Sequence, residues 1–187
     1  MDVYKNIHTY SDLLETNIKF FNNEIDETYY YGGKWGFSED QNNHADVATK
    51  NLIELTKYGF FTVNGQSSYN DKYIDQRSYL IFYMHKDTFN NLQNKLLNDN
   101  RIWTVFILPD YSIISNYDKS KENIFLTLFN GKECTIFPIK SYMRDEYLSN
   151  YKNIENILTN SVYCIVICKE FNKEPNSDQI LLELINK

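Results

Sequence analysis

The dipeptide Asn130-Gly131 lies between two strand-like runs, residues 123–129 (NIFLTLF) and 132–139 (KECTIFPI). Asn-Gly supplies positive φ at both central positions of a type I′ turn, which is the turn that suits a two-residue β-hairpin. Such a turn would set three pairs opposite each other: Phe125 with Ile136, Thr127 with Cys134, and Phe129 with Lys132. The chain is therefore expected to contain an antiparallel hairpin.

Hydrophobic periodicity predicts the other elements. Helices are expected over residues 11–25, over a segment that ends at Gly59, and over 87–100, 141–159 and 177–187; strands are expected at 59–63, 77–84, 101–108 and 161–171. Residues 64–76 lack an apolar period and are expected to form a loop. The strand–helix–strand unit from 77 to 108 could give a parallel pair through a right-handed crossover.

This order of elements favours an α+β fold. We expect a mixed, mainly antiparallel sheet of about six strands with about five helices. The 187 residues show no break in composition, so residues 1–187 are expected to form a single globular domain.

The charge and composition of the chain disfavour two classes of binding partner, duplex nucleic acid and the membrane. The formal charge is −6 and there are only three arginines, so binding of duplex nucleic acid is disfavoured. No apolar run approaches the ~18 residues of a membrane span, and the first ten residues do not resemble a signal peptide. Three cysteines fit no disulfide framework. We therefore expect a soluble, cytoplasmic protein without a membrane partner.

The motifs that carry catalytic chemistry are incomplete. The glycines of YYYGGKWGF (residues 29–37) do not have phosphate-loop spacing, and in GQSSY the residue Tyr69 replaces the second glycine of a nucleophile elbow. Cys164 and Cys168 share one face of a predicted strand, where buried structural thiols are expected. The histidines are scattered and the loop acids are typical of solvated side chains, so we expect neither a metal nor a cofactor.

A group of polar side chains remains as the candidate site. Gln66 ends one predicted strand, while Gln76 and Arg77 open the next, so neighbouring strands would bring their side chains together. A guanidinium with amides suits a carboxylate, a phosphate or a base edge. Trp35 would add an apolar wall, and His44 is a possible general base. The structural alternative is that the three polar side chains brace the strand ends.

The same region resembles a bacterial domain family of unknown function. In that family a Tyr/Gly-rich stretch precedes a helix, a Gly-aromatic-x-Thr strand ends in Gln, and a Gln-Arg pair opens the next strand. The matching positions lie within residues 29–84: Tyr30, Tyr31, Gly32, Gly33, Leu52, Leu55, Gly59, Phe60, Thr62, Gln66, Gln76 and Arg77. The family usually has Ser-Gln followed by Pro-Gly, whereas this chain has Gly65-Gln66 followed by two serines. The resemblance implies no reaction.

Three functions follow from these features. The first is binding of a small polar molecule, such as a nucleotide or an amino-acid derivative, between the aromatic-glycine loop and the Gln66–Arg77 loop. The second is a hydrolase or transferase that acts on a nucleotide-like or amide substrate, with His44 or a loop acid as the base. The third is an interaction domain that binds another protein through exposed tyrosines.

Overall fold

The computed structural model describes residues 3–25, 49–118, 123–138, 144, 152–171 and 174–187. Five strands form one sheet in the order β1 (Phe60–Gln66), β4 (Tyr79–Met84), β9 (Val162–Cys168), β5 (Ile102–Ile107), β6 (Ile113–Ser115). Four strands form a second sheet in the order β2 (Tyr69–Asn70), β3 (Ile74–Gln76), β7 (Asn123–Phe129), β8 (Lys132–Pro138). Both sheets are antiparallel, and the α+β class is confirmed.

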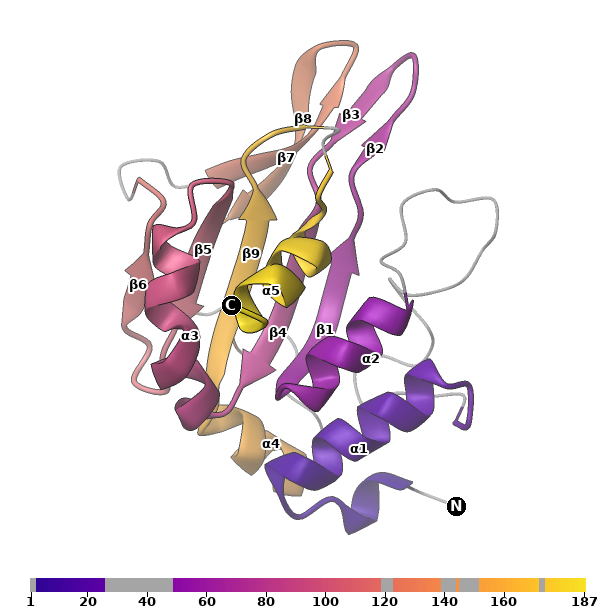
Figure 1. The fold of residues 1–187 in the computed structure, drawn as a ribbon, viewed down its shortest axis with the longest axis vertical. Coiled ribbons are helices and arrows are strands. Elements are labelled where there is room, and N and C mark those ends of the chain that lie inside the picture. Colours follow the sequence, from indigo (N-terminus) through magenta and orange to yellow (C-terminus); the bar gives the residue numbers. More distant parts are fainter. Residues whose placement is uncertain (1–2, 26–48, 119–122, 139–143, 145–151, 172–173) are drawn as a thin grey trace.

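Helices cover one face of the five-stranded sheet. A short 3₁₀ helix, η1 (Val3–Asn6), comes before five α-helices: α1 (Tyr10–Phe21), α2 (Thr49–Lys57), α3 (Lys86–Asn98), α4 (Lys152–Thr159) and α5 (Ser177–Ile185). Figure 1 shows α2, α5 and α3 side by side across β1, β4, β9 and β5, and each of these helices contacts the strands beneath it. The Asn51 side-chain amide joins α2 to α5 by donating to the buried Asp178 carboxylate over 2.6 Å.

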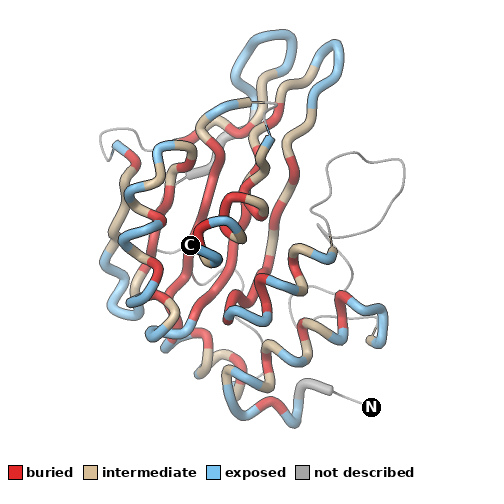
Figure 2. The backbone as a smooth tube through the Cα atoms, in the orientation of Figure 1, coloured by how far each residue is buried: buried red, intermediate tan, exposed pale blue. Residues whose placement is uncertain are grey.

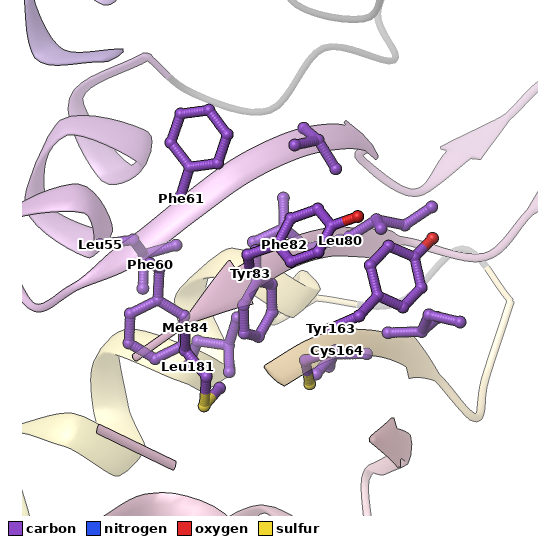
Figure 3. Packing of buried hydrophobic residues seen from close by; sticks show 14 of the residues in the cluster. Leu55, Phe60, Phe61, Leu80, Phe82, Tyr83, Met84, Tyr163, Cys164 and Leu181 are labelled. Atoms are coloured by element: carbon purple, nitrogen blue, oxygen red, sulfur yellow. The ribbon is translucent and has the colours of Figure 1, made fainter. Parts of the chain in front are cut away.

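The three middle strands are almost entirely buried, and only Tyr79 of β4 and Trp103 of β5 are partly exposed. All seven residues of β9 are buried, and Figure 2 shows β4 and β9 as continuous buried strands. Successive side chains leave a strand on opposite faces, so Phe60 and Phe61 point to opposite sides of β1 (Figure 3). The Phe60 ring packs against the ring of Phe82, with 4.7 Å between their centroids.

The predicted crossover is corrected by the position of β9. Strands β4 and β5 each pair antiparallel with β9, so they run in the same direction but do not touch as a ladder. The expected single mixed sheet of about six strands is thus replaced by two antiparallel sheets. Periodicity reveals which residues form strands, but the order of strands depends on contacts between segments far apart in the chain.

The Asn130-Gly131 turn is confirmed, with φ of 49° and 74° at its two residues. Phe125 pairs with Ile136 and Phe129 with Lys132, as predicted. Thr127, however, pairs with Thr135 rather than Cys134, because the register of the ladder shifts on either side of Thr127.

Residues 64–76 are not the predicted loop. Strand β1 continues to Gln66, and β2 and β3 form a short hairpin that joins the second sheet. The segment has no apolar period because this hairpin projects beyond the helices (Figure 1), so few of its side chains enter the core.

Helix boundaries differ from the expectation by a few residues. Thr9 caps α1 in a capping box with Asp12, His85 caps α3, and Asn176 caps α5. Gly59 follows α2 with a φ of +96°, as its predicted role requires. The predicted start of the fourth helix at residue 141 lies outside the described residues. Ile154 and Leu158 of α4 are buried.

Candidate functional site

Gln66, Gln76 and Arg77 lie where the chain passes from one sheet to the other. Gln66 ends β1 opposite Tyr79 of β4, and Gln76 ends β3 opposite Tyr69 of β2. Strand β1 pairs with β4, as the sequence interpretation assumed, but Gln76 ends β3 of the other sheet instead of opening β4, and Arg77 lies between β3 and β4. Gln76 is buried with 8% of its surface exposed, and Gln66 is half-buried.

The Arg77 guanidinium is bonded to the main chain of both sheets. Its Nε donates to the carbonyl oxygen of Phe125 in β7 over 3.0 Å. Its Nη1 donates to the carbonyl oxygen of Cys168, at the end of β9, over 3.3 Å and to that of Lys169. The backbone N–H of Arg77 also donates to the carbonyl oxygen of Leu126. These bonds support the structural alternative, in which Arg77 braces the strand ends.

Two aromatic rings enclose this guanidinium. Its central carbon lies 3.7 Å from the ring centroid of Phe171 and 5.0 Å from that of Trp103. Burial lowers the pKa of Arg77, but an arginine stays charged at neutral pH. No carboxylate in the described part of the chain forms an ion pair with it. Carbonyl dipoles and ring faces therefore replace a counter-ion.

A cavity of about 330 Å³ adjoins the segment that Arg77 holds. It lies where the end of β9 and the start of β5 approach the first turn of α5, three segments that Figure 1 places close together. The described residues that line it are Asn100, Arg101, Cys168, Lys169, Glu170, Glu174, Pro175 and Ile180. Because the Cys168 and Lys169 carbonyls accept from Arg77, Arg77 positions one wall of this cavity.

The charged groups of the cavity differ in their partners. Arg101 Nη2 lies 2.7 Å from the Asp99 carboxylate and Arg101 Nη1 lies 2.6 Å from that of Glu183. The hydrogen bond from Arg101 is also the main cause of a lowered pKa at Asp99. Within the described ranges, neither Lys169 nor Glu174 forms an ion pair. Lys169 and Glu174 thus supply a cation and an anion that a ligand can contact, and Glu170 adds a second acidic residue to the lining.

A second, shallower hollow of about 430 Å³ lies near the start of α1. His8 and His85 line it together with Tyr10 and several Asn residues of α4 and its flanks. The Tyr10 hydroxyl donates to the carbonyl oxygens of Tyr83 and Gly59, and burial raises its pKa far above the usual range. Tyr10 is thus a poor acid or base, and the described lining of this hollow contains no cysteine or carboxylate.

The bases proposed for an enzyme are not supported by their described surroundings. Asp71 accepts from the backbone N–H of Tyr73 and Ile74 over 2.6 Å and 2.8 Å, so it closes the β2–β3 turn. The bond from Tyr73 is the main cause of a lowered pKa at Asp71, which makes it a weaker base. His44 and Trp35 lie outside the described residues, and their predicted roles stay predictions.

The serines and cysteines have structural surroundings. Ser68 donates from its N–H and hydroxyl to the Asn176 side chain over 2.9 Å and 2.6 Å, which ties the β1–β2 link to the cap of α5. Cys164 and Cys168 are buried, as predicted, and Cys134 is exposed. Among the described residues, no group of three or more His, Cys, Asp or Glu is arranged to hold a metal ion.

Exposed aromatic residues are scattered over the described surface rather than gathered in one large patch. Tyr73 and Phe129, near the tips of the two hairpins, are each about half exposed, and their ring centroids are 6.5 Å apart. Tyr58 and Tyr111 are exposed on other elements. This pair of rings is the strongest support for the interaction alternative.

The fold and the cavity together define an α+β protein with two antiparallel sheets and a charged hollow at one end of the larger sheet. No protein-family model and no curated protein matches the chain. In the described part of the chain, no helix has the length and apolar character needed to cross a membrane.

Sequence reasoning missed the residues of this cavity. Lys169, Glu170 and Glu174 belong to the run KEFNKEPNSD, which separates a buried strand from a capped helix. This concentration of charged residues between two apolar elements could have indicated a polar site. Arg101 carried no such signal, because it reaches the cavity only when β5 pairs with β9.

Proposed function

We propose that the protein binds a small polar ligand, a nucleotide or an amino-acid derivative, in the cavity beside Lys169. The observation that carries the proposal is the pair of charged side chains, Lys169 and Glu174, which line a concave site without an ion-pair partner in the described chain. Ligand sites are typically concave and contain a few polar groups that orient the ligand.

The surroundings of the cavity favour a preformed site. Arg77 holds the Cys168–Lys169 main chain from one side, and the backbone N–H of Lys169 donates to the Arg101 carbonyl over 2.9 Å. Pro175 and the buried Ile180 supply apolar contact. A wall with a rigid main chain loses little conformational entropy when a ligand binds, which improves affinity.

The experiment is a thermal-shift screen of amino acids, their derivatives, nucleotides and simple carboxylic acids, with each hit measured by calorimetry. Lys169→Ala is expected to weaken the binding of an anionic hit at least about tenfold, equivalent to about 1.4 kcal/mol. Lys57→Ala is the control, because Lys57 is an exposed lysine of α2 that does not line the cavity.

Two results would contradict the proposal. Either no compound of the panel binds at millimolar concentration, or every hit keeps its affinity in Lys169→Ala. Gln66 and Gln76 are not among the described residues that line this cavity, and Trp35 lies outside the described residues, so their roles as ligand contacts stay predictions. The same calorimetry on Gln66→Ala and Gln76→Ala tests the two that the structure describes.

A further inference from the structure

From the charges of the cavity we infer that its ligand is zwitterionic: an amino-acid-like molecule whose carboxylate meets Lys169 and whose ammonium group meets Glu174. This inference rests on the proposed function and specifies the class of ligand for the same site.

The lining of the cavity carries charges of both signs. The lining contains two basic residues, Arg101 and Lys169, and two acidic residues, Glu170 and Glu174. The Arg101 guanidinium is already bonded to Asp99 and Glu183, so it contributes little net attraction. What remains is a site of both signs, which attracts a ligand with both signs more than it attracts a simple anion.

Lys169 and Glu174 come from different segments of the chain. Lys169 follows directly after β9, whereas Glu174 lies three residues before α5. They enter the cavity from two different segments of chain, so a ligand between them can contact both. A ligand with one charge would pair with only one of these two side chains and would forgo the attraction of the other.

The lining fits an amino-acid derivative better than a nucleotide. None of the described lining residues is aromatic, so they offer no ring on which a base could stack. Its volume of about 330 Å³ lies at the small end of ligand pockets, which span roughly 300 to 1,000 Å³. Pro175 and Ile180 instead offer a small apolar surface that suits an aliphatic side chain.

The test combines blocked ligands with matched variants. The standard L-amino acids are first titrated into the full-length protein by calorimetry. The tightest binder is then compared with its N-acetyl form and its carboxamide form, each of which lacks one charge. On the unaltered protein each block is expected to weaken binding at least about tenfold, equivalent to about 1.4 kcal/mol.

The variants assign each end of the ligand to one side chain. In Lys169→Met the free acid and the carboxamide are expected to bind equally, while the N-acetyl form still binds more weakly. In Glu174→Gln the free acid and the N-acetyl form are expected to bind equally, while the carboxamide still binds more weakly. Lys57→Met and Glu54→Gln remove an exposed pair of the same types on α2 and are expected to leave all affinities unchanged. Both Lys169 and Glu174 lie outside the core, so the variants should fold, and a thermal melt checks this.

The outcomes distinguish this inference from the proposed function. Equal binding of the free and blocked forms, or binding of nucleotides with no binding of amino acids, overturns the zwitterion assignment but leaves ligand binding intact. The assignment is also overturned if Lys169→Met removes the difference in affinity between the free acid and its N-acetyl form, or if Glu174→Gln removes the difference between the free acid and its carboxamide. If neither amino acids nor any compound of the wider screen binds, both proposals fail.

Discussion

At the scale of single residues, Arg77 shows how one side chain can join two sheets. Its guanidinium spans from a carbonyl of β7 to two carbonyls at the end of β9, and it packs against the rings of Phe171 and Trp103. A planar group with several N–H donors can do this, whereas the compact ammonium of a lysine cannot.

Arg77→Ala is therefore expected to destabilise the protein by about 2 to 4 kcal/mol, because it leaves carbonyl groups at the junction without their charged donor. Arg77→Lys should recover less than half of that loss. Urea unfolding followed by circular dichroism measures both.

Arg101→Ala is the matched control for this measurement. Arg101 also makes several side-chain bonds. The side chain of its partner Asp99 is 9% exposed, but those of Arg101 itself and of its partner Glu183 are 32% and 45% exposed. Such pairs typically contribute about 0 to 1 kcal/mol. An equal loss in Arg77→Ala and Arg101→Ala would contradict the bracing role of Arg77.

At the scale of elements, two glycines with a positive φ lie at the ends of a helix and a strand, and their surroundings differ. Gly59 follows α2 with a φ of +96°, and a methyl group there would lie 2.9 Å from the Thr88 hydroxyl oxygen. Gly131 closes the β7–β8 turn with a φ of +74°, and a methyl group there would meet nothing within 4 Å. The first position is restricted by both backbone and packing, the second by backbone alone.

Gly131→Ala is accordingly expected to cost about 1 to 2 kcal/mol, which is the penalty of left-handed backbone for an L-residue. Gly59→Ala should cost about 1 kcal/mol more, because the Thr88 side chain must also move. Thr88→Ala in the Gly59→Ala background should restore that additional part.

Equilibrium unfolding of the single and double variants measures these terms as a double-mutant cycle. The packing explanation fails if Gly59→Ala costs no more than Gly131→Ala, or if Thr88→Ala gives no recovery beyond its own effect.

At the scale of the whole molecule, the three cysteines differ in burial, so their reactivity shows which parts of the protein are buried. Cys164 is fully buried on β9, Cys168 is 4% exposed at its end, and Cys134 is exposed on β8. Burial also raises the pKa of Cys168 to about 12, so little of its reactive thiolate forms at neutral pH.

A thiol-reactive maleimide is therefore expected to label Cys134 rapidly in the native protein, whereas the other two cysteines should react only on unfolding. Mass spectrometry of peptides from native and denatured samples counts the labels. Native labelling of Cys164 at the rate of Cys134 would contradict the burial of β9.

Local features could be predicted because they depend on neighbouring residues. The Asn130-Gly131 turn, the positive φ of Gly59 and the buried faces of α3 and β9 all follow from periodicity or backbone preference. The candidate site was predicted less well. Arg77 was selected for its donors, but those donors are directed to carbonyls of β7 and β9, which are distant in sequence.

The sequence by itself determined the α+β class, most of the helices and strands, and the hairpin turn, because these depend on interactions within a few residues. The tertiary structure decided the insertion of β9 between β4 and β5, the division into two sheets and the place of Arg77 between them. It also decided that Arg101, Lys169 and Glu174 line one cavity. These features depend on which distant segments pair, and pairing is selected by the total burial of the folded chain rather than by any local pattern.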